Sequence, residues 1–331
     1  GRVQKMEQLN WAVLGTGAIA NEMALAFKAM GRTLGAVGSR SPEKAAAFAK
    51  RYGAQKAYAD FREMFTDPAV DVIYLATPNN THMEFLRAAL AGGKHVLCEK
   101  SIALNSRELA DAARLAEQRG LVLAEAMTIW HMPLYKELRR MVGAGELGRV
   151  QMMTLNFGSF KEYDMQNRFF APSLAGGALL DIGVYALSLA RGFMESQPDR
   201  VLSQMRPAPT GVDEQAGILL MNRQGQMATL ALSLHAKQPK RAVISCEKGY
   251  LEILEYPRAD RALWVDAATG AQRVLAAGEA ARALQYELED MERAVLTGDA
   301  GPMRLGETAD VMALMTALRR EWGLQYPGEV W

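Results

Sequence analysis

The segment from Trp11 to Ala20 constrains the fold more than any other feature, because it combines an apolar run, a glycine turn and a helix start. Gly15, Gly17 and Ala20 have the GxGxxG/A spacing of a strand that passes into the first helix of a dinucleotide-binding unit. There the first glycine permits a tight turn, the second lets a pyrophosphate approach the backbone, and the small third residue lets helix and strand pack closely. A glycine turn needed only for packing is the alternative. The spacing favours a dinucleotide site, formed by Gly15, Thr16, Gly17, Ala18 and Ile19.

The rest of the first 126 residues repeats this alternation of apolar runs and helical patterns. Such a rhythm predicts βαβ units that form a parallel sheet. We predict strands over residues 11–14, 33–38, 72–76, 95–98 and 121–124, and helices over 18–30, 42–51, 81–91 and 105–119. Residues 1–126 are therefore predicted to form a Rossmann dinucleotide-binding domain.

The pattern changes in residues 127–331, where strand-like runs follow one another directly. The runs cover residues 150–157, 216–221, 227–234, 241–247 and 250–255, and helical patterns cover 176–193, 279–296 and 306–322. We predict a C-terminal α+β domain with a large, mostly antiparallel open sheet that helices cover on one face. The overall class is therefore α/β.

Composition excludes several classes of function. The 331 residues include 38 Lys and Arg against 37 Asp and Glu, so no basic field exists that would bind nucleic acid or an anionic membrane. The two cysteines, Cys98 and Cys246, lack metal-ligand spacing, so we expect no metal site. No apolar stretch reaches the roughly 18 residues of a membrane span. The polar first ten residues also lack the apolar run of a signal peptide, so we expect a soluble cytoplasmic protein.

The end of the second predicted strand bears on the choice of nucleotide. An acidic residue there would accept hydrogen bonds from a ribose 2′-hydroxyl, whereas Ser39 and Arg40 offer donors and positive charge to a 2′-phosphate. NADP is therefore favoured over NAD. In the alternative interpretation, Arg40 is only a solvated residue ahead of the next helix.

Ligands of open parallel sheets bind beyond the carboxyl ends of the strands. Two segments place polar residues there, one over Thr77, Pro78, Asn79 and His82 and the other over Glu99 and Lys100. A lysine that ends a buried strand is partly desolvated and can stabilise an alkoxide or tune a neighbouring acid. A simple ion pair between Lys100 and a carboxylate is the alternative.

A third segment supplies a proton-transfer group. Asp181 and Tyr185 are four residues apart, so they share one face of a predicted helix whose neighbouring positions are apolar. Polar groups on such a face require partners. A buried tyrosine whose hydroxyl donates to a carbonyl is the alternative.

Together these motifs resemble the glucose-fructose oxidoreductase, inositol dehydrogenase and rhizopine-catabolism (Gfo/Idh/MocA) family over nearly the whole chain. The branch most similar is the group of dimeric dihydrodiol dehydrogenases and NADP-linked D-xylose dehydrogenases, which carry tyrosine where inositol dehydrogenases carry histidine. The resemblance implies subunit contacts through the open sheet, as a homodimer or homotetramer. The motifs are Gly15-Thr16-Gly17, Ala76-Thr77-Pro78-Asn79, Gly93-Lys94-His95-Val96-Leu97-Cys98-Glu99-Lys100, Glu125-Ala126-Met127 and Gly176-Gly177-Ala178-Leu179-Leu180-Asp181-Ile182-Gly183-Val184-Tyr185.

The resemblance also implies roles. It places Lys100 beside the reacting carbinol, Tyr185 as the general acid/base and Asp181 as a group that orients substrate or shares its proton. We expect the Lys100 ammonium to favour tyrosinate at Tyr185. Asn79, His82 and Glu99 match family residues on the nicotinamide side, so they join Ser39, Arg40, Thr77, Pro78 and Lys100 as expected cofactor-binding residues.

Two positions depart from the family pattern, and a third matches it on the substrate side. Ser101 stands where relatives usually have proline, and Trp130 stands where they often carry arginine, so we expect an indole platform for substrate. Arg168 matches a family arginine and would hold substrate oxygens, with an exposed surface charge as the alternative. We expect substrate contacts from Lys100, Trp130, Arg168, Asp181 and Tyr185.

The function that follows is an NAD(P)-dependent dehydrogenase or reductase. We expect hydride transfer between the nicotinamide and a secondary alcohol or carbonyl of a sugar, polyol or cyclic diol. One alternative is an enzyme that retains its nicotinamide and oxidises the substrate only transiently during sugar chemistry without net redox change. Another is a dinucleotide-binding regulator without catalysis.

Overall fold

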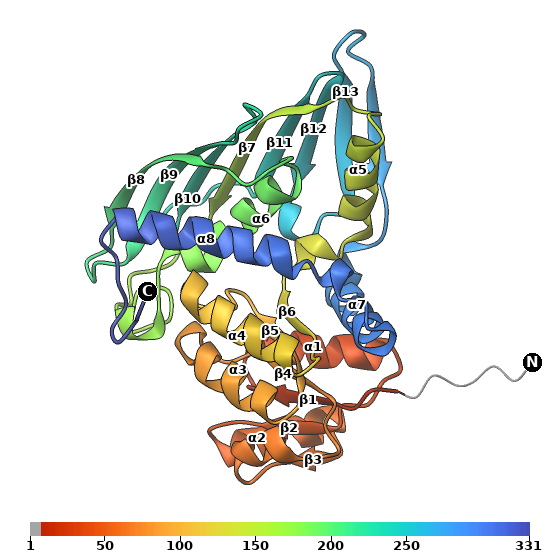
Figure 1. Cartoon of the computed structure of the whole chain (residues 1–331), viewed down its shortest axis with the longest axis vertical. Helices are drawn as coiled ribbons and strands as arrows, with labels where there is room; N and C mark the ends of the chain where they lie inside the picture. The colour runs from red at the N-terminus through yellow and green to blue at the C-terminus, as the bar shows by residue number, and fades with distance from the viewer. Residues whose placement is uncertain (1–7) are drawn as a thin grey trace, which may run out of the picture.

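The computed structural model describes residues 8–331, so the sequence interpretation of residues 1–7 lies outside it. The chain forms two sheets at opposite ends of the molecule, with helices between and around them (Figure 1). A parallel sheet of six strands comes first in the chain and a mixed sheet of eight strands comes second. The α/β class and the division into a Rossmann half and an α+β half are confirmed.

The first sheet has the order β3-β2-β1-β4-β5-β6, and its strand pairs are parallel. The chain turns from one side of β1 to the other between β3 and β4, so the carboxyl ends of β1 and β4 open into a crevice at a topological switch point. The elements are β1 (Trp11–Leu14), α1 (Ala18–Ala29), β2 (Ala36–Gly38), α2 (Pro42–Tyr52), β3 (Lys56–Ala57), η1 (Phe61–Thr66), β4 (Val72–Leu75), η2 (Asn79–Thr81), α3 (His82–Ala91), β5 (His95–Glu99), α4 (Ser106–Gln118) and β6 (Leu123–Ala126).

Local signals explain where these elements begin and end. The Ser41 hydroxyl accepts the backbone N–H of Lys44 ahead of Pro42, the first residue of α2. The Asn105 side chain likewise accepts the N–H of Glu108 at 2.9 Å and begins α4. Each strand from β1 to β6 except β3 is largely buried, as expected for a parallel sheet covered on both faces.

The second sheet has the order β14-β13-β12-β11-β7-β10-β9-β8, and only β7 and β10 pair in parallel. Helices α6 and α8 lie against one face (Figure 1), and residues along the strands alternate between buried and more exposed. The elements are η3 (Thr128–Trp130), α5 (Pro133–Gly143), β7 (Val150–Gly158), η4 (Pro172–Leu174), η5 (Leu179–Gly183), α6 (Val184–Gly192), β8 (Arg200–Pro207), β9 (Asp213–Met221), β10 (Met227–Ser233), β11 (Arg241–Cys246), β12 (Gly249–Leu254), η6 (Tyr256–Arg258), β13 (Arg261–Asp266), β14 (Gln272–Ala276), η7 (Ala280–Arg282), α7 (Ala283–Thr297), η8 (Gly301–Met303) and α8 (Leu305–Glu321).

Four strands were not predicted from the sequence. β3 has only two residues, and both are exposed. β8 and β14 are edge strands with many exposed polar residues, and β13 forms a hairpin with β14. An edge strand shows weak apolar alternation, because only one side of it pairs and much of it contacts water.

Helix α7 lies in a different place from the one predicted. We expected the helix near residues 279–296 to cover the second sheet, but Leu284, Leu288 and Met291 pack in the same core as Trp11 and Phe27 of the Rossmann half. Their spacing places them on one helical face, which buries against α1. α7 therefore ties the two halves of the chain together.

Within residues 8–331, one helical stretch, Pro172–Gly192, is long and apolar enough to cross a membrane by length and composition. The protein buries 78% of its most apolar window. This segment contains η5 and α6, so it is a core helix that packs against the second sheet.

Candidate active site

The turn after β1 has the conformation that the glycine spacing requires. Gly15 has φ +112°, and its N–H donates to the Gly38 carbonyl at 2.9 Å. A Cβ on Gly15 would lie 2.5 Å from the Ala76 carbonyl oxygen, so a side chain is excluded there. A Cβ on Gly17 would meet no atom within 4 Å, so the backbone ahead of α1 is open to a ligand. The first turn of α1 carries no acidic residue, which leaves its N–H groups available to an anion.

One residue that supports this turn was missed by the sequence analysis. The Asn21 amide donates to the carbonyl of Thr16 at 3.2 Å and to that of Gly17 at 2.8 Å, and the Tyr52 hydroxyl donates to the Asn21 carbonyl oxygen. Asn21 therefore fixes the loop from within α1. No spacing rule could identify it, because Tyr52 lies on a different helix.

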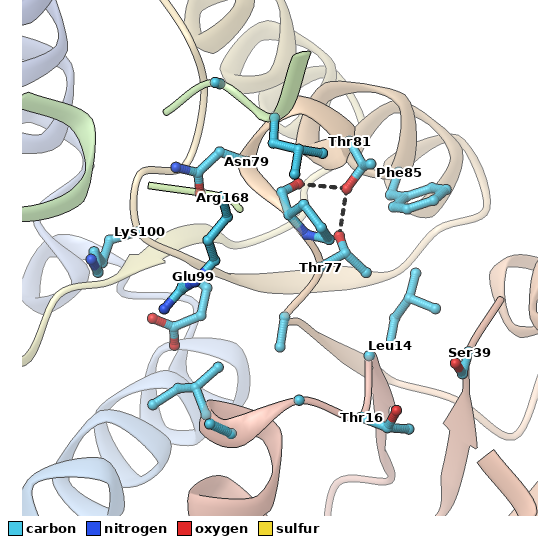
Figure 2. A pocket seen from close by; sticks show the side chains of 18 of the residues that line it. Leu14, Thr16, Ser39, Thr77, Asn79, Thr81, Phe85, Glu99, Lys100 and Arg168 are labelled. Carbon is cyan, nitrogen blue, oxygen red and sulfur yellow. Dashed lines mark hydrogen bonds between the residues drawn. The ribbon is translucent and has the colours of Figure 1, made fainter. Parts of the chain in front are cut away.

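A cavity of about 660 Å³ extends from this turn to the ends of β4 and β5 (Figure 2). The expected cofactor residues that line it are Gly15, Thr16, Gly17, Ala18, Ile19, Ser39, Arg40, Thr77, Pro78, Asn79, Glu99 and Lys100. Phe61 and Phe85, which the sequence analysis did not single out, line its far end, and the Arg40 guanidinium lies 5.9 Å from the Phe85 ring centroid. The cavity thus presents a cation beside aromatic faces at the end of β2, as a 2′-phosphate and an adenine require.

The loop after β4 is fixed by its own hydrogen bonds. The Thr81 hydroxyl lies 2.7 Å from Thr77 Oγ1 and 2.6 Å from the Pro78 carbonyl oxygen (Figure 2). His82 does not reach the cavity, in contrast to our expectation of a cofactor contact. It is fully buried, and its ring nitrogens lie 2.8 Å from the carbonyl oxygens of Thr77 and Ser101. His82 therefore positions the loops that follow β4 and β5.

Lys100 lies at the end of β5 and forms the ion pair that was the alternative to a catalytic role. Its ammonium donates to the main-chain carbonyl of Asp181 at 2.5 Å and lies 3.4 Å from Asp181 Oδ1. It also lies 4.9 Å from the ring centroid of Tyr185. Burial lowers the pKa of Lys100, but Asp181, Tyr185 and Glu99 outweigh that effect and raise it above its ordinary value. Lys100 is therefore a cation at neutral pH.

Asp181 and Tyr185 are brought together by a π turn, not by a regular α-helix. Leu179–Gly183 is π-helical and continues into α6, and both side chains point to the cavity. π turns recur at functional sites because they shift one side chain relative to the α-helical register. The shared face predicted from the four-residue spacing is therefore present, although the backbone geometry differs.

Packing explains why a glycine stands at position 177, just ahead of this turn. Gly177 has φ +122°, and a Cβ on it would lie 2.0 Å from Asp213 Oδ1. The other carboxylate oxygen of Asp213 accepts the N–H of Leu179 at 2.6 Å, at the start of the π turn. Burial raises the pKa of Asp213 to about 7. A side chain at position 177 would displace the residue that holds the catalytic segment in place.

Tyr185 is the group best placed to exchange a proton. Its ring stacks on Phe157 with centroids 5.8 Å apart and an interplanar angle of 17°. Its side chain lines the cavity that begins at the glycine turn and also a second cavity described below. Burial raises its pKa, and Lys100, which lowers it, does not offset burial. Lys100 therefore acts in the expected direction, toward tyrosinate, but burial has the larger effect and keeps Tyr185 a neutral acid.

A second cavity of about 460 Å³ also borders Tyr185. Lys100, Arg168, Asp181, Tyr185 and Arg258 line both cavities. Arg168 is exposed, as the surface-charge alternative has it, and its guanidinium lies 4.6 Å from the Phe169 ring while its side chain reaches the cavity (Figure 2). The catalytic candidates therefore lie where the two cavities meet.

Trp130 lies outside both cavities. We expected its indole to form a platform for substrate, but the side chain is 0% exposed and lines neither cavity. It packs in the core so closely against α6 that a Cβ on Gly192 would lie 3.0 Å from it. A buried indole cannot contact substrate, so the assignment of Trp130 as a substrate residue is wrong.

Two contacts between segments far apart in the sequence were not predicted. The Tyr74 hydroxyl donates to Glu99, and burial raises the pKa of that carboxyl. Arg258 donates to Glu22 at 3.0 Å, linking η6 to α1 at the cavity wall. Both pairs join residues that only the folded chain brings together.

The chain is similar in sequence to known oxidoreductases. Residues 9–127 match the model of the oxidoreductase family with an NAD-binding Rossmann fold, and residues 135–252 match the GFO/IDH/MocA C-terminal domain. A trans-1,2-dihydrobenzene-1,2-diol dehydrogenase of Mus musculus is 30% identical over 251 residues, which cover 74% of each chain. One of Xenopus laevis is 28% identical and covers 96% of this chain and 99% of its own.

Solved structures share the fold at lower identity. KijD10, a 3-ketoreductase from Actinomadura kijaniata in complex with NADP and TDP-benzene, superimposes with a TM-score of 0.85 at 23% identity, over 95% of this chain and 98% of its own. Levoglucosan dehydrogenase in complex with NADH and levoglucosan gives a TM-score of 0.83 at 20% identity, over 94% of this chain and 98% of its own. At these identities the likeness shows the shared fold.

Proposed function

Because the chain belongs to the GFO/IDH/MocA family of NAD(P)-binding oxidoreductases, we propose that it is an NADP-preferring dehydrogenase or reductase of a sugar, polyol or cyclic diol. The observation that carries this proposal is that Lys100, Asp181 and Tyr185 line both the cavity that begins at the glycine turn and the second cavity. The curated relatives named as diol dehydrogenases support the substrate class.

The residues present fit a dinucleotide. The open backbone at Gly17 and the free N–H groups of α1 would hold a pyrophosphate, while Ser39 and Arg40 would hold a 2′-phosphate. Thr77, Pro78, Asn79 and Glu99 would line the nicotinamide end. A bound nicotinamide would supply the acceptor or donor of hydride.

The chain's own residues then supply the proton and the charge. In the reduction direction, neutral Tyr185 donates its hydroxyl proton to the carbonyl oxygen as that oxygen gains charge. Lys100 stabilises the developing alkoxide and the tyrosinate that remains, because it stays cationic between Asp181 and the Tyr185 ring. Asp181 holds the lysine in place through its main-chain carbonyl and its carboxylate. In the oxidation direction the same hydroxyl, once ionised, accepts the substrate proton.

The test is the initial rate of nicotinamide absorbance change with NADP or NAD and a panel of aldoses, inositols and cyclic diols. We expect at least one substrate to be turned over with a lower KM for NADP than for NAD. No turnover across the panel, combined with dinucleotide released on denaturation, would contradict the proposal and favour an enzyme that retains its nicotinamide or a regulator.

We also propose that two or four copies of this cytoplasmic enzyme assemble through the second sheet. Large apolar side chains on its strands are exposed, with Leu202 at 68%, Leu254 at 58% and Val274 at 63%. They lie on three strands of this sheet, β8, β12 and β14, and exposed apolar groups favour a protein contact. Light scattering at micromolar concentration tests this, and a monomer would contradict it.

A further inference from the structure

We propose that the second cavity contains an anion subsite, in which Lys161 and Lys240 bind a carboxylate or phosphate group of the substrate. This inference rests on the proposed function and deepens it, because it names a charge that the substrate carries away from its reacting carbon. Neither lysine takes part in the proton transfer described above.

The charge of the cavity is the first argument. Five cationic side chains line it, namely Lys100, Lys161, Arg168, Lys240 and Arg258, against two carboxylates, Asp181 and Glu255. The whole chain carries a net charge of only +1, so this excess is local. Neutral sugars are bound by hydrogen bonds and need no excess of positive charge, whereas cations that converge in a cleft raise the local concentration of anions.

The partners of the two lysines are the second argument. Lys240 lies 3.9 Å from Glu255, whose side chain is 78% exposed and therefore well solvated. In the described part of the chain Lys161 has no carboxylate within 4.0 Å. Their ammonium groups instead lie over aromatic rings, 4.4 Å from the centroid of Phe169 for Lys161 and 5.0 Å from that of Phe157 for Lys240. Both lysines can therefore pair with a ligand.

The backbone that carries the lysines is well ordered by hydrogen bonds, which is the third argument. Lys161 follows β7 and Lys240 precedes β11. The Lys161 N–H donates to the Leu234 carbonyl at 2.8 Å, and His235 Nδ1 lies 2.8 Å from the Lys161 carbonyl oxygen. Gly158 also bridges to Gln238 across the two segments. Lys161 and Lys240 thus extend into one cavity from loops that pair with each other.

The position of the lysines separates them from the cofactor. Both line the second cavity and neither lines the cavity that runs from Gly15 to Lys100. Phosphates bound at the glycine turn would therefore leave them uncompensated. Lys240 lies over Phe157, and Phe157 stacks on Tyr185, so the subsite adjoins the ring of the proton donor.

The experiment compares substrates that differ in one charged group. Glucose, glucuronate and glucose 6-phosphate are assayed with the wild type, with Lys161→Gln, with Lys240→Gln and with the double variant. Lys237→Gln is the matched control, because Lys237 is exposed on the loop ahead of β11 and lines neither cavity. Calorimetric titration of gluconate and of sorbitol into the NADP-loaded protein measures binding without turnover.

We expect the wild type to prefer an anionic sugar over glucose by about tenfold or more in kcat/KM, the range of hydrogen bonds to charged groups. The double variant should lose that preference through a higher KM, with kcat changed less than twofold and with Lys237→Gln like the wild type. Gluconate should bind more tightly than sorbitol, and the difference should vanish in the double variant and shrink in 0.5 M salt. A preference for the phosphate over the carboxylate, or the reverse, identifies the group.

Equal kcat/KM for glucose and both anionic sugars, with no effect of the double variant, overturns the anion subsite while the proposed function stands. Equal binding of gluconate and sorbitol overturns it as well. If neither these sugars nor any member of the wider panel is turned over although gluconate binds in a lysine-dependent way, the proposed function fails and the subsite stands.

Discussion

The cofactor cavity and the substrate cavity share Lys100, Asp181 and Tyr185, but they are built by different means. The cofactor side uses glycine, alanine and backbone N–H groups in short segments that directly follow β1, β2 and β4. The substrate side uses long side chains from β7 and the segment after it, from the loop ahead of β11 and from η6, and the last two are distant from β7 in the sequence. The cofactor side therefore depends on small residues that leave the backbone accessible. The substrate side depends on charged and aromatic side chains that converge on one cavity.

This difference predicts how the two sides respond to substitution. Adding atoms to the cofactor side should block the ligand, because its function depends on space and open N–H groups. Removing groups from the junction or the substrate side should change proton transfer or substrate choice and leave the cofactor bound. Each prediction below tests one side of that contrast.

The largest effect is expected at the junction. Tyr185→Phe and Lys100→Met should each lower kcat by about 100-fold or more, since each removes a proton-transfer or charge-stabilising group. The dissociation constant for NADP, measured by fluorescence titration, should change less than threefold in Tyr185→Phe. Tyr250→Phe, an exposed tyrosine on β12 outside both cavities, is the control. Near-normal turnover in both junction variants would contradict the assignment.

The pH dependence should differ between the two directions of reaction. Burial raises the pKa of Tyr185 above its ordinary value, so the hydroxyl is protonated throughout the neutral range. Carbonyl reduction, which uses the protonated form, should be nearly independent of pH from 6 to 9. Alcohol oxidation, which needs the ionised form, should rise about tenfold per pH unit over that range. An oxidation rate that does not depend on pH would exclude Tyr185 as the base of a chemistry-limited step.

Gly17 tests whether the glycine turn exists for a ligand or for packing. A Cβ at this position meets no atom within 4 Å, so Gly17→Ala should leave the melting temperature within about 2 °C of wild type. It should nevertheless weaken NADP binding by tenfold or more, because the methyl group would occupy the approach to the backbone. Gly15→Ala should destabilise the fold itself, since its Cβ would lie 2.5 Å from the Ala76 carbonyl oxygen. Unchanged NADP affinity in Gly17→Ala would favour a packing role.

Arg40 tests the choice of nucleotide with a smaller effect. Arg40→Ala should lower the preference for NADP over NAD by about tenfold, because it removes a cation that pairs with the 2′-phosphate. NAD affinity should be nearly unchanged. Calorimetry with both nucleotides measures the ratio, and an unaltered ratio would leave Arg40 as a solvated residue beside Phe85.

The sequence predicted the cofactor side far better than the substrate side, for physical reasons. A glycine turn, strand ends and a helix cap are local features, so Gly15, Thr77 and Lys100 could be placed from spacing alone. His82 and Trp130 were misplaced because the residue type does not tell whether a polar or aromatic group faces a cavity or the core. The convergence of Lys161 and Lys240 depends on pairing between strands distant in sequence, which no local pattern reports.

Substitution of Trp130 should have the smallest effect on activity. It tests most sharply where the substrate cavity ends and the core begins. Its indole is fully buried and its Nε1 has no hydrogen-bond partner in residues 8–331. Trp130→Phe leaves a void but also removes a buried unpaired N–H, so the free energy of unfolding should fall by only about 1–2 kcal/mol. Thermal unfolding measures that loss, and kcat/KM for each substrate should stay within twofold of wild type. A change in substrate preference without a change in stability would mean that the indole contacts substrate in a conformation other than this one, and the boundary drawn between core and cavity would be wrong.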